Sequence, residues 1–137
     1  MRVHSIEAIP IDTPLTRNFG GSTYAVLKRS TVITRLRTDE GLVSEVYNGD
    51  NRARGREIVR LIHDELAPCV RGLDLFGGER LWERLFALTH VSRDRKTLME
   101  AIACVDCARW DVVGKALGQS VSRLPGRAAR HPLVRGA

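Results

Sequence analysis

The strongest constraint on the fold of this chain is a segment, residues 98–117, with more apolar surface than a small domain can cover. Its apolar side chains recur at helical spacings of three and four residues on two separate stripes. The first stripe is Leu98, Ile102, Val105, Ala108 and Val112, and the second is Met99, Ala103, Trp110, Val113 and Leu117. An amphipathic surface helix buries one stripe, so a helix with two stripes needs cover from two directions. We therefore expect this helix to pack against its own domain on one side and against a neighbouring domain on the other.

The first half of the chain has the alternating pattern and the turn residues that are typical of β-strands. Three strands are predicted, over residues 3–11, 24–37 and 42–47. A polar, glycine-rich loop is expected over residues 17–23, and Gly41 supplies the positive φ of a tight turn before the third strand. Val32, Thr34 and Leu36 alternate onto one face of the second strand. The pattern predicts an antiparallel meander.

The second half of the chain is typical of helices. They are predicted over residues 52–67, 78–89 and 96–117. Asp50 or Asn51 can cap the first helix, and Pro68 is expected to end it because proline lacks an N–H and its ring blocks the preceding turn. Gly118 is the expected C-terminal stop of the third helix. Strands followed by helices predict an α+β fold, a three-stranded antiparallel meander followed by a three-helix bundle.

The charge distribution argues against a nucleic-acid partner. The net charge is +6, but residues 1–121 contribute only +2, and their basic residues alternate with acids, as in Arg56-Glu57. The remaining charge comes from four arginines in a tail without acids, Arg123, Arg127, Arg130 and Arg135. No run of about 20 apolar residues indicates a membrane span, and the N-terminus lacks the apolar core of a secretory signal. We expect a cytoplasmic protein that binds neither nucleic acid nor membranes.

Three cysteines, Cys69, Cys104 and Cys107, do not form the even set of a secreted disulfide framework. Cys104 and Cys107 form a C-x-x-C pair in the middle of the third predicted helix. A zinc site needs four ligands, and a redox pair needs its first cysteine at an exposed helix start. We expect these cysteines to be buried, reduced and space-filling, and we predict no metal site in this chain.

The third predicted helix carries the most specific motif of the chain. It is Ala101…Val105-Asp106…Ala108-Arg109-Trp110-Asp111…Gly114-Lys115-Ala116-Leu117-Gly118. Weaker matches are Pro14-Leu15, the Thr38-Asp39-Glu40-Gly41 turn before Glu45, and Leu66-Ala67-Pro68 followed by Gly72 and Asp74. On these residues the chain, from residue 1 to about 124, resembles the N-terminal capping domain of the enolase superfamily, in the mandelate racemase and muconate lactonizing enzyme family. It is most similar to the sugar-acid dehydratase-like members.

The resemblance implies part of a Mg2+-dependent enzyme, an acid-sugar dehydratase or racemase that removes the proton α to a carboxylate. In that family the Mg2+ ligands and the general bases belong to a C-terminal barrel. No residue here matches them, so we assign no catalytic residue and no metal ligand, and we expect Mg2+ in the barrel only. The implied partners are the missing barrel domain, in the same chain or supplied in trans, and a small sugar-acid substrate in the complete enzyme. Without the barrel the chain is expected to be inactive.

The resemblance also implies that this domain is a lid over the barrel mouth, with loops at about residues 16–24 and 46–51. The residues expected to contact substrate in a complete homologue are Arg17, Phe19, Tyr24, Tyr47 and Asn48. The rings of Phe19 and Tyr24 would pack over a carbon chain, and the polar groups of the other residues would bond hydroxyls or a carboxylate. Plain alternatives stay open: Phe19 pins its own loop, Tyr24 is a strand residue and Arg17 is solvated.

The family pattern stops after Val121. We expect residues 1–121 to form the capping domain and residues 122–137 an irregular basic tail. One hypothesis is that the residues after Leu124 are translated out of frame or belong to a truncated gene, which the downstream DNA sequence would test. The alternative function is a stand-alone protein-interaction module that docks through the third helix, and both functions allow a homo-oligomer. Trp110 and Asp111 are expected to be structural.

Overall fold

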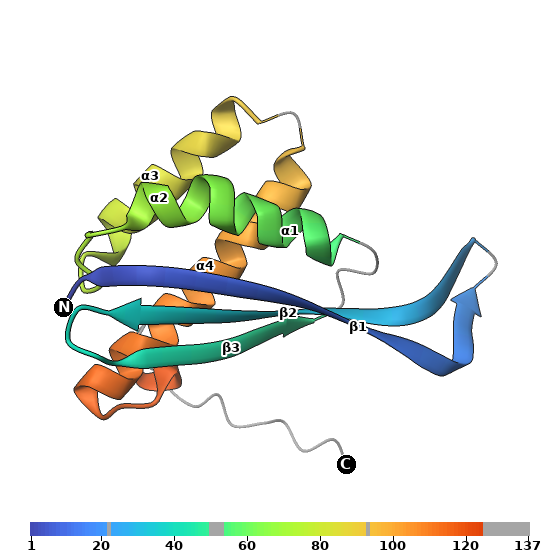
Figure 1. Ribbon diagram of the computed structural model, residues 1–137, viewed down its shortest axis with the longest axis horizontal. Helices are drawn as coiled ribbons and strands as arrows, with labels where there is room; N and C mark the ends of the chain where they lie inside the picture. Colours follow the sequence, from blue (N-terminus) through green and yellow to red (C-terminus); the bar gives the residue numbers. More distant parts are fainter. Residues whose placement is uncertain (22, 50–53, 93, 125–137) are drawn as a thin grey trace, which may run out of the picture.

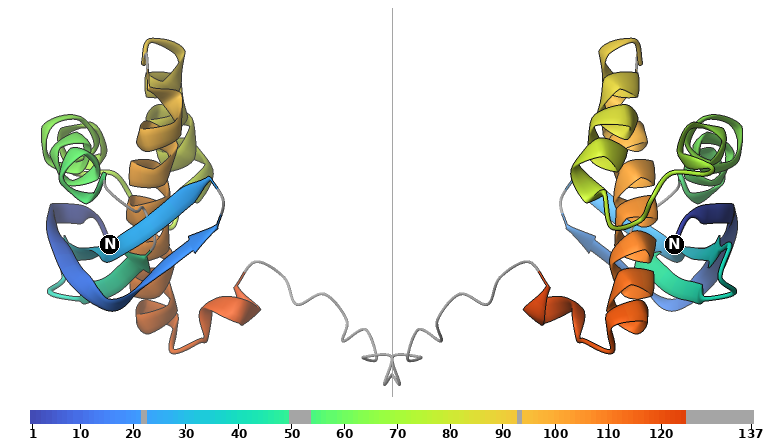
Figure 2. Two further views of the ribbon diagram at one scale, coloured as in Figure 1. Left: turned by 90° about the vertical axis from the view of Figure 1, so that its right-hand side faces the viewer. Right: turned by 90° about the vertical axis from the view of Figure 1, so that its left-hand side faces the viewer.

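The computed structural model has a β-sheet with helices on one of its faces. It describes residues 1–21, 23–49, 54–92 and 94–124, without the side chains of Asn18, Phe19 and Tyr24. Within these ranges an antiparallel sheet has the order β1-β2-β3, and the helices cover one of its faces (Figures 1 and 2). The strands are β1 (Val3–Gly21), β2 (Tyr24–Thr38) and β3 (Val43–Gly49). The helices are α1 (Gly55–Leu61), α2 (Ala67–Val70), α3 (Gly78–Ala87) and α4 (Arg95–Leu117), with a π-helical turn over Ile62–Leu66 and 3-10 turns over Leu88–His90 and Val121–Arg123. The predicted α+β architecture is confirmed.

The strands β1 and β2 run through the segment that was predicted to be a loop. Residues 17–21 belong to β1, and Gly20 pairs with Ala25 across the hairpin. The loop prediction was wrong because a β-ladder is held by backbone groups, so polar and glycine residues pair wherever the partner strand is long enough. The expected loop at residues 46–51 is also in part a strand, since β3 extends to Gly49. The tight turn at Gly41 is confirmed, with φ of 86°.

The hairpin of β1 and β2 projects beyond the helices, on the side away from the N-terminus (Figure 1). In this projecting part the strand pairing shifts register, because Pro14 pairs with Lys28 while Phe19 pairs with Val26; a second shift in the same ladder lies near its other end, between Val3 and Ser5. Residues 15–18 of β1 therefore face only Leu27 of β2. Extra residues on one strand make a bulge, which bends the ladder. We call residues 13–29 the hairpin arm and residues 15–18 its bulge.

The first helical region does not end at Pro68. After α1 the chain makes the π-helical turn, in which the N–H of Ala67 donates to the carbonyl of Ile62. Pro68 then lies in the first turn of α2, where a residue without an N–H is tolerated, so the prediction of a stop was wrong. The predicted cap at Asp50 or Asn51 lies outside the described residues.

The helix α4 is the centre of the core. Asp94 caps it by accepting from the backbone N–H of Thr97 at 3.1 Å, and Gly118 ends it in the left-handed conformation, as predicted, with φ of 61°. Every side chain of the first apolar stripe is buried. On the second stripe Val113 is buried, but Ala103 is exposed and Leu117 is 50% exposed. The domain thus covers one side of α4 and leaves part of the other side open.

Candidate functional site

The predicted lid residues lie toward one end of the sheet. This end is made of the hairpin arm and the end of β3 (Tyr47–Gly49), which point to the same side in Figure 1, and we call it the lid end. Arg17 is in the bulge of the arm, and its side chain is exposed. The backbone of Phe19 pairs with Val26 and that of Tyr24 with Gly21, whereas the side chains of Phe19 and Tyr24 lie outside the described part of the structure.

Tyr47 and Asn48 are neighbours on β3, and the structure does not bring their side chains together. Tyr47, which is 79% exposed, lies on the face of the sheet opposite to the helices. Asn48 lies on the helical face, where its Nδ2 is 3.7 Å from the Sγ of Cys107 on α4. The Oδ1 of Asn48 is buried and has no hydrogen-bond partner within the described ranges. Asn48 therefore has an unpaired but buried acceptor, and Tyr47 is exposed on the other face.

A polar cluster at the root of the arm was missed by the sequence analysis. Lys28 Nζ donates to Oδ2 of Asp12 at 2.6 Å, and Ser30 Oγ donates to Oδ1 of the same carboxylate at 2.6 Å. These two bonds, that of Lys28 first, hold the pKa of Asp12 below its ordinary value, with a further contribution from the charge of Arg56 on α1. The cluster ties β1 to β2 at the point where the arm leaves the sheet.

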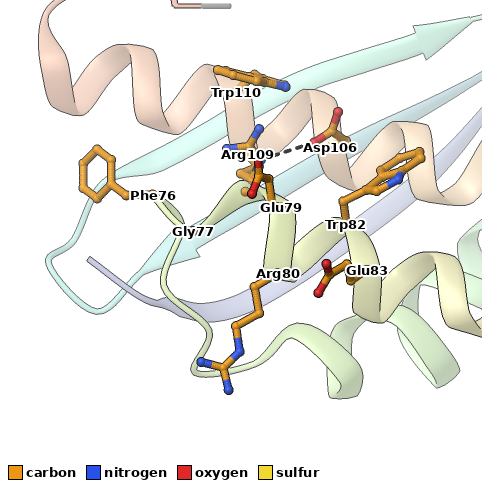
Figure 3. Close-up of a pocket in the computed structure, with 10 residues that line it drawn as sticks. Phe76, Gly77, Glu79, Arg80, Trp82, Glu83, Asp106, Arg109 and Trp110 are labelled. Atoms are coloured by element: carbon orange, nitrogen blue, oxygen red, sulfur yellow. Dashed lines mark hydrogen bonds and ion pairs between the residues drawn. The ribbon is translucent and has the colours of Figure 1, made fainter.

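A groove of about 820 Å³ lies between α3 and α4 (Figure 3). It is lined by Phe76, Gly77, Gly78, Glu79, Arg80, Trp82, Glu83, Asp106, Arg109 and Trp110. Arg109, which is only 5% exposed, donates from Nη1 to the carbonyl of Leu75 and from Nε to Asp106 Oδ1, both at 3.2 Å. Its guanidinium also lies 4.1 Å from the centre of the Trp110 ring. A buried charge with these partners is a structural link between α4 and the segment before α3.

The groove is at the other end of the sheet from the lid end. The segment before α3 lies against the start of β1. The N–H of Leu75 donates to the carbonyl of Met1 at 3.1 Å, and the backbones of Arg2 and Asp74 form an isolated antiparallel β-bridge. Trp110 packs against Arg109, and Asp111 forms an ion pair with Lys115 at 2.7 Å. Asp111 thus pairs with a lysine rather than with an arginine, and a structural role for the two residues stays a prediction. The groove and the predicted substrate contacts are therefore separate features.

Within the described ranges no three His, Cys, Asp or Glu side chains converge into a group that could hold a metal ion. The Mg2+ chemistry that the family implies has no ligand set among these residues. The cysteines are free, and burial raises the pKa of Cys104 to about 11. Cys107 is exposed, so the prediction that it is buried was wrong: on α4 it lies outside the buried first stripe. No described helix is long and apolar enough to cross a membrane.

Solved structures share this fold. The crystal structure of a mandelate racemase/muconate lactonizing enzyme is 44% identical in sequence and superposes with a TM-score of 0.80. The match covers 85% of this chain and 32% of the chain of that enzyme. A second such enzyme, from a marine actinobacterium and in complex with magnesium, is 39% identical with a TM-score of 0.72 over 85% of this chain and 30% of its own. The fold is thus the α+β fold of enolase-type N-terminal domains.

Sequence comparison defines the family. The model of the mandelate racemase / muconate lactonizing enzyme N-terminal domain matches residues 5–126, and the chain belongs to this family. A D-mannonate dehydratase from Sphingomonas sp. is 39% identical over 109 residues, which are 77% of this chain and 26% of that enzyme. A D-galactonate dehydratase family member from Streptomyces bingchenggensis is 36% identical over 108 residues. The chain spans about a quarter of the length of these curated relatives.

Proposed function

We propose that residues 1–121 are the substrate-facing lid of a Mg2+-dependent acid-sugar dehydratase or racemase that removes the proton α to a carboxylate. The observation that carries this proposal is the lid end, where the hairpin arm and the end of β3 extend to the same side, in a chain related to D-mannonate and D-galactonate dehydratases. In this proposal the barrel that completes the active site supplies the Mg2+ ligands and the bases, as the family resemblance implies.

The chemistry of the lid in this proposal is recognition. The exposed guanidinium of Arg17 would pair with a carboxylate or with hydroxyls of a sugar acid. The unpaired Oδ1 of Asn48, which is buried in the isolated chain, would accept a hydrogen bond from a substrate hydroxyl once the side chain turns outward, and the exposed Tyr47 would add a hydroxyl of its own. Phe19 and Tyr24 are suited by residue type to pack over the carbon chain. A lid of this kind binds the substrate and excludes water, and the reacting atoms stay with the barrel.

A domain exchange tests this function. Residues 1–121 would replace the corresponding domain of a D-mannonate dehydratase relative, and dehydration of a panel of aldonic acids would be measured. We expect the exchange to change the preference among the acids, and Arg17→Gln in the exchanged enzyme to raise KM about tenfold with kcat little changed, because a charged hydrogen bond to bound substrate is lost.

The matched control for this exchange is Arg37→Gln, an exposed arginine of β2 outside the arm, which should leave KM unchanged. Equal effects of the two substitutions would contradict the assignment of Arg17. The chain by itself should show no Mg2+-dependent dehydration of any aldonic acid. Turnover by the isolated chain would refute the proposal that the catalytic groups belong to the barrel.

A second candidate function is a protein-interaction module that docks through α4. The observation that favours it is the open side of that helix, where Leu117 is 50% exposed, and the exposure of Val121 (40%) in the 3-10 turn that follows the helix. The two functions are distinguished by comparing the self-association of the unmodified chain and of the Leu117→Glu variant, measured by analytical ultracentrifugation. Self-association that this substitution abolishes, together with no effect of the domain exchange on substrate preference, would favour the interaction module.

A further inference from the structure

The hairpin arm leaves the sheet between two prolines. Pro10 and Pro14 flank Asp12 on β1, and they pair with Val32 and Lys28 of β2. Each proline ring fixes φ at about −65°. Strand β1 therefore has few soft torsions on either side of Asp12, and the root of the arm is stiff.

Asp12 joins the two strands at this root. Its two carboxylate oxygens accept from different residues of β2, Lys28 and Ser30, each at 2.6 Å. Ser30 is 1% exposed, whereas no described side chain of the arm beyond it is buried. The side chains of Asp12 and Lys28 are 34% and 41% exposed, so this pair lies on the boundary between the covered sheet and the free ribbon.

The bulge follows directly beyond the root. Its four β1 residues, 15–18, face Leu27, which is 62% exposed. The third strand gives no support there, because β3 ends at Gly49, opposite Thr31. A two-stranded ribbon alone is only marginally stable in water. The weakest point of the ladder is therefore the bulge, with a stiff root on one side and a short ribbon on the other.

We propose that the cluster of Asp12, Lys28 and Ser30 is the fixed root of the arm and that the bulge at residues 15–18 is its hinge. This inference rests on the proposed lid function, because it locates the moving part of the lid. Residues 10–14 stay with the sheet while the tip of the hairpin turns about the bulge. Arg17 lies in the hinge itself, so the angle of the arm sets where its guanidinium reaches. Asp12 is a positioning residue, which acts on a substrate only through the arm.

Amide hydrogen exchange of the full chain, measured by NMR, tests the root. In the unmodified chain we expect the amides of the strand pairs on the root side of the bulge to exchange much more slowly than those on the tip side, with an abrupt change at the bulge. Asp12→Asn should speed exchange at residues 11–13 and 28–31 by about fivefold and leave α4 unchanged, because the ladder is weakened only locally. Lys28→Gln should act in the same direction and less strongly, since Ser30 still donates to the carboxylate.

The matched control for the root is Glu45→Gln. It removes the partner of Arg35, an ion pair at 2.7 Å on the same sheet, and it should not change exchange in the arm. Deleting residues 16–18 tests the hinge, because one residue then faces Leu27 and the ladder becomes continuous. We expect the tip amides to slow by about fivefold toward the values of the root.

Three results would overturn the inference: protection that declines smoothly through the bulge, an arm that responds equally to Asp12→Asn and Glu45→Gln, or a tip unaffected by the deletion. These measurements involve neither barrel nor substrate. A failure here leaves the lid function to the domain exchange, and a failure of the exchange leaves the hinge intact as a structural property.

Discussion

The helix α4 and the hairpin arm are held in place by different forces. Eleven residues of α4 are buried, and they include its apolar first stripe. In the described part of the arm no side chain is buried, and its order comes from backbone pairing and one polar cluster at its root. Packing makes every position of α4 depend on the whole core, whereas a ribbon can change locally. This contrast is compatible with the proposed lid, which requires a core that stays folded while the arm moves.

The largest expected effect is on the α4 side of this contrast. Ile102 is fully buried, so Ile102→Ala removes apolar contacts and leaves a cavity. We expect the free energy of unfolding to fall by about 2–5 kcal/mol, as measured by urea denaturation. The matched control is Leu27→Ala in the arm, which should change it by no more than about 0.5 kcal/mol. Similar costs at the two positions would remove the distinction between core and arm.

A smaller loss is expected where α4 is approached by its own C-terminal extension. A Cβ on Gly114 would lie 2.9 Å from the backbone oxygen of Gln119, and the side chains of Val121 and Leu124 are also near. Gly114→Ala should therefore displace this extension and destabilise the fold by about 1–2 kcal/mol, with the higher helix propensity of alanine offsetting part of the overpacking. Ala103→Ser, at an exposed position of α4, is the control, and a stabilised Gly114→Ala variant would contradict the close approach.

Lowering the pH should affect α4 and the hairpin arm through two different carboxylates, Asp94 and Asp12. Hydrogen bonds from Thr97, and after them the charge of Arg54, hold the pKa of Asp94 below its ordinary value, and Asp12 is held low by Lys28 and Ser30. A lowered folded-state pKa means that the stabilisation is present above the ordinary value and is lost as the pH falls through the folded-state value. We expect unfolding midpoints to drop on acidification below pH 4, with a shallower drop in Asp94→Asn.

Asp12→Asn should reduce this acid dependence of global unfolding less than Asp94→Asn does, and its main effect should be on the exchange of the arm amides. The physical reason is that Asp94 caps the core helix α4, whereas Asp12 caps no helix and joins two strands at the edge of the core. An equal loss of acid dependence in the two variants would show that the arm root is coupled to the core.

The smallest expected effect is that of shortening the arm. Replacing residues 15–27 by Asn-Gly joins Pro14 to Lys28 through a two-residue turn of a type that hairpins favour. Because no described side chain of the removed ribbon is buried, the free energy of unfolding should change by about 0.5 kcal/mol or less. Thermal denaturation followed by circular dichroism measures this. A large loss of stability would mean that the arm is part of the core.

Local chemistry accounts for the features that could be predicted. The two stripes of α4, its end at Gly118 and the turn at Gly41 each depend on residues within a few positions of one another, so they are visible in the sequence. The candidate site could be predicted from the sequence only in part. Arg17, Tyr47 and Asn48 came from the family resemblance, and the strand order then brought the arm and the end of β3 to one end of the sheet.

The pairing of Asp12 with Ser30 shows where local reasoning ends. If the pairing of Phe19 with Val26 at the tip continued without a bulge, Asp12 would lie opposite Ile33. The bulge shifts the register by three residues, so Asp12 lies opposite Ser30 instead. Nothing near Asp12 in the sequence reveals that shift. The same holds for the burial of Arg109 against Leu75, which joins segments far apart in the chain.

Amphipathic periodicity and turn chemistry thus account for the order and type of the elements, because both act between neighbours along the chain. The register of the arm, the passage of the helical region through Pro68 and the opposite faces taken by Tyr47 and Asn48 were decided by the assembled fold. Each depends on contacts between distant segments, and such contacts form only when sheet and helices come together.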